Sequence, residues 1–348
     1  MKIFYILVAL IVFAILILTH ELGHYIAARI FGVKIYEFSI GMGPKMVTWT
    51  SKKTDIKYSI GILPIGGYVS MAGEDEESDD ENALSKKEAW KRLIIVVAGA
   101  AMNLACGFIV MFMLMSAVSD NLYSTTVAEI VPKEKYNYEI STSESGLLAG
   151  DKILSVDGKR VRIAAELDYE IMRNGIDTVE LVVLRNGKKL SLDVDFPTVV
   201  SNGQIFGVRD FNYVRESGSF LNVLKHGFFR STLNVRMVWE SIFDLITGRF
   251  GMEAVSGPIG VTTAISDAAQ SSFLDLLYLA VVISINLGVI NMMPLPALDG
   301  GRAVFIILEM IRRKPVPVKY EGMVHFVGIV LLMGLMLIIS LKDIISLF

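Results

Sequence analysis

The feature that most constrains this chain is the segment Thr19–His24, which reads Thr-His-Glu-Leu-Gly-His at the end of an almost wholly apolar run beginning at Ile3. On a helix, positions i and i+4 share a face, so the imidazoles of His20 and His24 can bind one metal ion. Glu21 would lie beside them, placed to take a proton from a metal-bound water. The pattern therefore predicts zinc-dependent hydrolysis inside a membrane helix.

The membrane context separates this interpretation from its alternative, in which the same polar residues merely anchor a helix at the interface. A charged side chain at the centre of a membrane costs about 2.5 to 3.5 kcal/mol, and residues that bear this cost are functional by default. Chance alone would produce the motif in about one in a hundred chains of this length. We therefore favour the metal site.

Composition places the whole chain in a membrane. Over 348 residues the sequence is 53% hydrophobic, with a mean hydropathy of +0.53, which is too apolar for an ordinary soluble protein. The net charge of −3 and the absence of a basic patch interleaved with aromatic residues exclude a nucleic-acid partner. A single cysteine, Cys106, excludes an internal disulfide and a multi-cysteine zinc site, so His and carboxylate remain as ligands.

Four apolar segments predict transmembrane helices within residues 1–31, 93–118, 273–301 and 323–342. The first lacks a cleavage site of the A-x-A type, so we expect it to stay in the mature protein. The connections before the second span and after the third are rich in Lys and Arg, which predicts that both are cytoplasmic. Both termini and the long stretch between spans two and three would then lie outside.

This topology identifies a third ligand. The first helix would run from outside to inside with its motif in the inner half, since Ile3 to His20 covers about 27 Å of a core roughly 30 Å thick. The third span runs in the same direction, and Pro294 and Pro296 interrupt it near its inner end. Asp299 follows at the depth of the two histidines. The alternative for Asp299 is a helix cap or an interfacial carboxylate.

The motif His20-Glu21-x-x-His24 in the first span, together with Asn291-x-x-Pro294-x-Pro296-x-Leu298-Asp299-Gly300 in the third, resembles the site-2 protease family of intramembrane zinc metalloproteases, in its regulator-of-sigma-E protease branch. Further matches are Gly41-Met-Gly43-Pro44, Pro64-Ile-Gly66-Gly67-Tyr68-Val69 and Gly257-Pro258-Ile259-Gly260. In the second span, where the family has G-P-x-x-N, this chain has Gly99-Ala-Ala-Met-Asn103.

The resemblance implies zinc ligands at His20, His24 and Asp299 and a catalytic base at Glu21. It further implies substrate contacts at Asn103, Gly67, Tyr68 and Asn291. Asn291 could hold the substrate backbone or stabilise the developing oxyanion, and the alternative is a hydrogen bond between helices.

Residues 32–92 contain short glycine-bounded runs of β-forming residues, which predict hairpins. By resemblance this region is partly in the membrane beside the active site, where a strand edge could pair with an unwound substrate. A plain cytoplasmic hairpin is the alternative. The acidic run 74–81 predicts a solvated loop, and we assign it no chemistry.

Between residues 125 and 198 the composition becomes that of a soluble β-rich domain, which resembles a PDZ domain. Such a domain could bind a peptide along a sheet edge or act only as a filter that excludes bulky substrates. Residues 219–250 show helical spacing of apolar residues with basic residues between, which predicts an amphipathic helix on the outer membrane surface or under the PDZ domain. We predict that His226 is a surface residue and His325 an interface residue.

Together these features predict a polytopic α-helical membrane protein with four transmembrane helices, a membrane-associated cytoplasmic β-hairpin region and one extracytoplasmic PDZ domain. It would lie in a bacterial plasma membrane and cleave single-span membrane proteins, such as anti-sigma factors or remnant signal peptides. One alternative is a zinc-stabilised scaffold whose PDZ domain binds partners without cleavage, although such a site needs no Glu21. A transporter would show inverted repeats, and the two halves of this sequence show none. The oligomeric state is left open.

Overall fold

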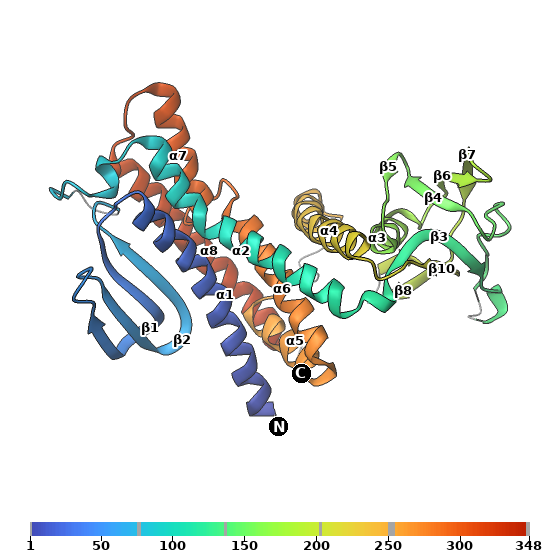
Figure 1. Ribbon diagram of the computed structural model, residues 1–348, viewed down its shortest axis with the longest axis horizontal. Helices are drawn as coiled ribbons and strands as arrows, with labels where there is room; N and C mark the ends of the chain where they lie inside the picture. The colour runs from blue at the N-terminus through green and yellow to red at the C-terminus, as the bar shows by residue number, and fades with distance from the viewer. Residues whose placement is uncertain (1, 75–77, 136–137, 202–203, 250–254, 346–348) are drawn as a thin grey trace. The chain divides into compact units, whose positions relative to one another are not determined.

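The computed structural model describes residues 2–74, 78–135, 138–201, 204–249 and 255–345 (Figure 1). Its contacts divide the chain into two compact units, Met1–Val110 with Asn234–Phe348 and Met111–Leu233. Part of the acidic run, residues 75–77, and the last residue of the predicted segment 219–250 lie outside the described residues.

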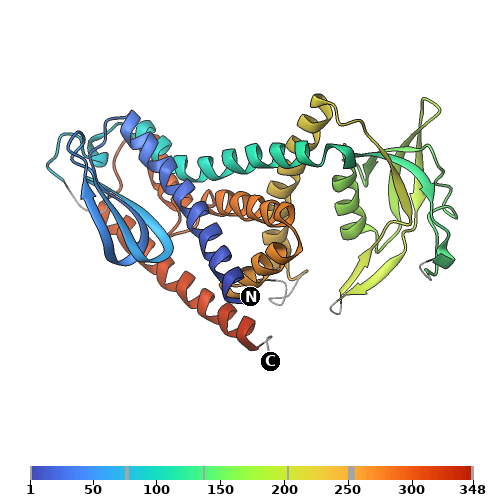
Figure 2. The same ribbon diagram turned by 60° about the horizontal axis from the view of Figure 1, so that its bottom comes forward.

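Four helices in the described residues are long and apolar enough to cross a membrane, and each overlaps one of the four predicted spans. They are α1 (Lys2–Ile30), α2 (Ala89–Ala117), α6 (Phe273–Asn291) and α8 (Val318–Ile345). The C-terminal part of α1 and the N-terminal half of α2 lie side by side in both Figure 1 and Figure 2. The contact is close because Gly23 of α1 has no side chain: a Cβ there would lie 2.3 Å from the carbonyl oxygen of Ala98.

The third predicted span is not one continuous helix. Helix α6 ends at Asn291, a tight loop containing Pro294 and Pro296 follows, and a separate helix α7 (Asp299–Arg312) begins at Asp299. The prolines end the helix because each lacks a backbone N–H and clashes with the preceding turn. A further helix that was not predicted, α5 (Pro258–Ser271), precedes α6. Its first turn is capped by Asp343 of α8, whose Oδ2 accepts from the backbone amides of Gly257 and Gly260, each at 2.9 Å.

The β-region contains two long antiparallel strands, β1 (Ile35–Thr50) and β2 (Lys57–Met71), that bend and pair twice. Residues 35–40 pair with both 67–71 and 57–60, and residues 45–50 pair with 57–61. The predicted hairpin is therefore present, but with a more complex register. A short 3₁₀ helix (Leu84–Lys86) then leads to α2. The buried core here joins the sheet to α1 and α2 through Ala27, Ala28, Val33, Ile35, Phe38, Ile56, Val69, Met71, Leu84 and Ile95.

The second unit contains an antiparallel sheet with strand order β10-β3-β4-β6-β7, to which β5 adds beside β4. The bounds of its elements are β3 (Tyr123–Ile130), β4 (Lys152–Val156), β5 (Lys159–Arg160), α3 (Ala164–Asn174), β6 (Val179–Arg185), β7 (Lys188–Val194) and β10 (Phe211–Arg215). Strand β10 lies outside the predicted range 125–198, yet it pairs with β3 and contributes Phe211 and Tyr213 to the core. The turn between β6 and β7 has positive φ at Asn186 and Gly187, as expected for a tight hairpin of this sequence.

Three smaller elements complete this part of the chain: a hairpin of β8 (Thr198–Ser201) and β9 (Gln204–Gly207), and 3₁₀ turns at Ser119–Asn121 and Lys133–Lys135. Helix α4 (Phe220–Thr247) occupies the segment predicted as an amphipathic helix.

The prediction of a surface position for His226 is wrong. Its side chain is buried and its Nε2 lies 2.8 Å from Oε2 of Glu216, because this carboxylate gives the imidazole a partner away from solvent.

Candidate metal centre

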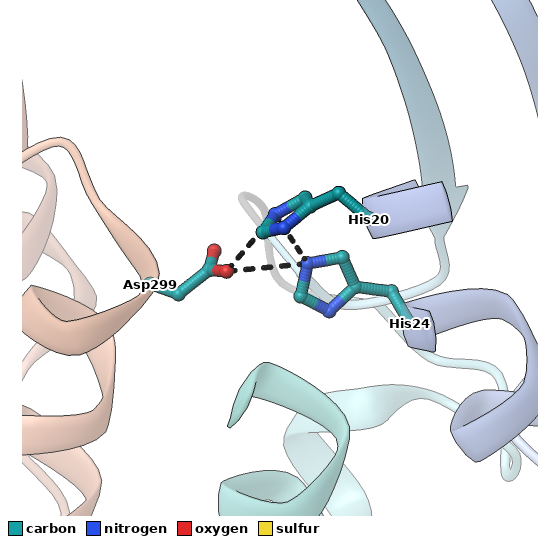
Figure 3. A group of neighbouring side chains, drawn as sticks. All are labelled: His20, His24 and Asp299. Atoms are coloured by element: carbon teal, nitrogen blue, oxygen red, sulfur yellow. Dashed lines mark hydrogen bonds and ion pairs between the residues drawn. The ribbon is translucent and has the colours of Figure 1, made fainter. Parts of the chain in front are cut away.

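Two imidazoles and one carboxylate from distant parts of the chain meet at one point (Figure 3). His20 and His24 lie one turn apart on α1, and Asp299 is the first residue of α7. Oδ2 of Asp299 lies 3.1 Å from Nε2 of His20 and 3.3 Å from Nε2 of His24. The two Nε2 atoms are 3.2 Å apart. The three atoms therefore form a nearly equilateral triangle.

The size of this triangle fits a tetrahedral metal ion. Zinc binds imidazole nitrogen and carboxylate oxygen at about 2.0 to 2.2 Å, which places neighbouring ligand atoms of a tetrahedron about 3.3 to 3.6 Å apart. Within the described residues, Oδ2 of Asp299 is buried and has no hydrogen-bond donor assigned to it. A buried carboxylate oxygen facing two imidazole nitrogens is the donor set that a divalent cation would complete.

Helix α2 sets the orientation of the His24 ring. Nδ1 of His24 lies 2.8 Å from the carbonyl oxygen of Ile95, so Nδ1–H donates to this carbonyl and Nε2 keeps its lone pair for a metal. One turn further along α2, Gly99 lies against the same ring, and a Cβ there would be 2.3 Å from Nε2. The glycine is needed because the imidazole fills the space of its side chain.

Asn103, predicted as a substrate contact, lies fully buried against the other histidine. Its side-chain amide is 3.5 Å from Nδ1 of His20. The metal-binding tautomer of His20 carries its proton on Nδ1. If the side-chain amide of Asn103 is turned by 180°, its Oδ1 faces that proton and can accept it in a hydrogen bond. Without this turn, the oxygen is buried and meets no donor among the described residues. The position of Asn103 therefore suits orientation of a ligand ring.

The loop before Asp299 is held in a strained conformation. Ala297 has φ of +75°, which is rare for a residue with a side chain, and its backbone N–H donates to Nδ1 of His325 at 3.0 Å. Gly300 and Gly301 let the start of α7 approach this loop closely. A Cβ on Gly300 would lie 2.1 Å from the carbonyl oxygen of Met293, and a Cβ on Gly301 would lie 2.4 Å from that of Leu295. This role of His325 was not predicted, because it depends on the proximity of α8 to the loop in space.

A cavity of about 240 Å³ opens onto the three candidate ligands. Glu21 and Tyr68 line it, and Gly67 lies beside Glu21, where a Cβ would come within 3.3 Å of the Glu21 Cγ. The backbone amide of Val69 interacts with the Glu21 carboxylate. The edge of β2 therefore brings Gly67 and Tyr68, both predicted as substrate contacts, beside the candidate base.

Arg302 closes another wall of this cavity. It pairs with Glu74 across 2.7 Å, from Nη1 to Oε1. Asn291 does not line the cavity. It ends α6 and lines a larger neighbouring groove, of which Asp299 also forms a wall.

Comparison with known proteins agrees with this geometry. The family model described as peptidase family M50 matches residues 8–335. A Fusobacterium nucleatum protein, whose name describes it as a zinc metalloprotease, is 33% identical over 323 residues, which is 92% of each chain. Zinc metalloprotease RasP of Geobacillus kaustophilus is 28% identical and covers 91% of this chain and 92% of its own.

The regulator of sigma-W protease RasP of Bacillus subtilis is 26% identical, and the match covers 91% of this chain and 93% of that relative. The family match includes His20, His24 and Asp299. With an H-E-x-x-H helix, a converging aspartate and a match over nearly its whole length, this chain belongs to peptidase family M50.

Proposed function

We propose that this protein is a membrane-embedded zinc endopeptidase that hydrolyses peptide bonds in or near the transmembrane segment of single-span membrane proteins. The observation that carries the proposal is the triangle of His20 Nε2, His24 Nε2 and Asp299 Oδ2, all within 3.3 Å of one another beside Glu21. The names of the relatives support zinc as the metal and proteolysis as the reaction.

The roles of the residues follow from their chemistry. His20, His24 and Asp299 would hold zinc, which supplies a Lewis acid with a fourth position open to water or substrate. Glu21 would take a proton from the attacking water and deliver it to the leaving amine. The Val69 amide and the packing of Gly67 would hold the Glu21 carboxylate in place for both transfers.

The edge of β2 would bind the substrate backbone. A helical substrate hides its peptide bonds within its own hydrogen bonds, whereas an added strand presents them. Residues 67–71 pair with residues 35–40 on one side, and their position beside Glu21 supports pairing of an unwound substrate there. Tyr68 would contact this segment from the cavity wall, and Asn291 would bind a freed peptide group.

The substrate class follows from the family and from one relative. Because the Bacillus subtilis relative is named as a regulator of sigma-W, membrane proteins that restrain a sigma factor are the first class to test, and remnant signal peptides are the second. The basic loops support a topology with both termini and the sheet of the second unit outside the cell and the zinc site near the cytoplasmic side. That sheet would be a PDZ domain, either binding peptide or excluding bulky substrates.

The test is cleavage in cells of a panel of tagged single-span proteins with truncated outer domains. Wild type is expected to produce a fragment, whereas Glu21→Gln should produce none while keeping its zinc, because the amide cannot accept the proton. Glu81→Gln, the same change at an exposed carboxylate outside the cavity, should cleave as wild type does.

Fragments from the Glu21→Gln variant would refute the assigned base. Absence of any fragment from a zinc-loaded wild type would favour the alternative, a scaffold that binds partners without cleaving them.

A further inference from the structure

An ion pair connects two walls of the cavity that contains the candidate base. Nη1 of Arg302 lies 2.7 Å from Oε1 of Glu74, and both side chains line this cavity. The two residues come from distant parts of the chain. Glu74 follows the end of β2, whereas Arg302 lies in the first turn of α7, three residues after Asp299. This pair, the Glu74–Arg302 bridge, therefore connects the strand beside the base to the helix that carries the third candidate ligand.

The chain between β2 and Glu74 is held in place by its backbone. Ala72 donates its N–H to the carbonyl oxygen of Lys34 at 2.9 Å and accepts from the N–H of Leu84 at 2.7 Å. Gly73 has φ of +68° and is so closely surrounded that a Cβ there would lie 2.6 Å from a neighbouring hydroxyl oxygen. A displacement of Glu74 is therefore transmitted to the end of β2.

The other end of the bridge is anchored through α7. Ala303 and Ile306 of this helix pack against α2 in a small buried cluster. Further along, Glu309 of α7 pairs with Arg92 of α2. Helix α7 is thus fixed to α2 by its own contacts, and the Glu74–Arg302 bridge adds a connection from its first turn to the β-region.

The cavity lies between the two walls that the bridge connects. Tyr68, Val69 and Met71 line it from β2, and Leu298 and Asp299 line it from the start of α7. A substrate strand paired with the edge of β2 would lie in this space. Successive residues of a strand are about 3.3 Å apart, whereas reacting groups must be held to within about 0.5 Å. A shift of a few ångströms between these walls would therefore present a different peptide bond to the metal.

We propose that Glu74 and Arg302 are positioning residues, which hold β2 and α7 at a fixed spacing and so determine which peptide bond of the substrate is cut. The inference rests on the proposed function. Charge-assisted hydrogen bonds are shorter and stronger than neutral ones, which suits a contact that fixes a distance. The two side chains are only 21% and 30% exposed, so salt screens their attraction less than on an open surface.

The experiment maps the ends of the fragments by mass spectrometry, with a panel protein that wild type cleaves. Glu74→Arg places two positive charges at the bridge, and Glu74→Arg combined with Arg302→Glu restores opposite charges in exchanged positions. Asp80→Arg is the matched control. It reverses a charge in the same acidic run, where Asp80 pairs with Lys34 at 3.2 Å and does not line the cavity.

Wild type and Asp80→Arg are expected to give one principal fragment end. Glu74→Arg should add ends one or two residues away and slow total cleavage at least about tenfold, because the reacting bond is no longer held in place. The exchanged pair should restore the single end. Zinc per protein should stay at the wild-type value in all variants, because the three ligands are intact.

The single wild-type end in Glu74→Arg would overturn the inference, as would several ends from wild type itself. Extra ends from the exchanged pair would show that the charges are not the cause. Loss of zinc from Glu74→Arg would also overturn it, since the bridge would then support only the metal ligand.

A milder variant covers the case in which Glu74→Arg does not accumulate in the membrane. Glu74→Gln removes the charge at nearly the same shape and should give the same extra ends in smaller amounts. Absence of cleavage of every panel protein by wild type would refute the proposed function. One unaltered end in every variant would refute only the role of the bridge, so the two failures are distinguishable.

Discussion

The His24 ring occupies the space that a side chain at position 99 would need: a Cβ on Gly99 would lie 2.3 Å from Nε2 of His24, the atom that faces Asp299. One turn further along α2, the Asn103 amide lies against the His20 ring. Two residues one turn apart on α2 therefore face the two histidines that lie one turn apart on α1. The pair of ligands is therefore matched by a pair of residues on the neighbouring helix. In the motif Gly99-Ala-Ala-Met-Asn103, the first and last residues make these contacts.

Gly99→Ala should displace the His24 ring and lower both zinc content and cleavage. The added methyl has to move either α2 or the imidazole, and a misplacement of about 1 Å can cost about 100-fold in rate. Zinc per protein and the rate of fragment release measure the effect. Gly334→Ala on α8 is the matched control, because a Cβ there meets nothing within 4 Å. Wild-type zinc content in Gly99→Ala would contradict the packing.

Asn103 is expected to act through His20. Asn103→Leu removes the partner of Nδ1 and should weaken zinc binding about 10- to 100-fold, the usual cost of losing such a partner. Asn103→Asp places a carboxylate oxygen where it can accept the Nδ1 proton, so it should retain zinc. Competition with a chelator measures both affinities. If Asn103→Leu instead raises KM at unchanged zinc affinity, Asn103 contacts substrate as the family resemblance implies.

His325→Leu should loosen the loop that carries Asp299. The change leaves the partly buried N–H of Ala297 without the acceptor that lies 3.0 Å away, and the loss would reach about 1 to 3 kcal/mol only if water could not replace it. Zinc affinity and kcat are expected to fall together. His325→Asn offers a carbonyl oxygen near the position of Nδ1 and should restore much of both. Equal defects in the two variants would show that ring packing, and not this hydrogen bond, is what matters.

Acid should destabilise the sheet of the second unit through Asp151. Burial alone would raise the pKa of this carboxyl, but Arg185, which donates from Nε at 2.7 Å and Nη2 at 2.6 Å, and the Leu148 amide hold the pKa below its ordinary value. Since the folded pKa is the lower one, the stabilisation is fully present above the unfolded pKa of about 3.9 and is lost as pH falls through the folded pKa.

Hydrogen exchange of residues 147–156 in the full-length protein, corrected for intrinsic rates, measures this loss. Protection should decline below about pH 4 in wild type. In Asp151→Asn, protection should be lower at pH 7 and should depend less on pH. An identical decline in both proteins would assign the acid sensitivity to other carboxyls.

The sequence by itself determined the features that depend only on which residues are neighbours along the chain. The spans follow from length and apolarity, and His20, Glu21 and His24 follow from helical periodicity within one span. The hairpin turn at Asn186 and Gly187 follows from backbone preferences of single residues. Asp299 was identified because prolines break a helix and because the depth of a residue in a membrane can be counted.

Tertiary structure decided the contacts that join segments far apart in the chain. His325 supports Ala297 from another helix, Asn103 faces His20, and residues 35–40 pair with two separate stretches of β2. No local pattern encodes these contacts, since each depends on how two elements pack and rotate against each other. Packing of α1 against α2, permitted by Gly23 and Gly99, turns a helical motif into an oriented metal centre.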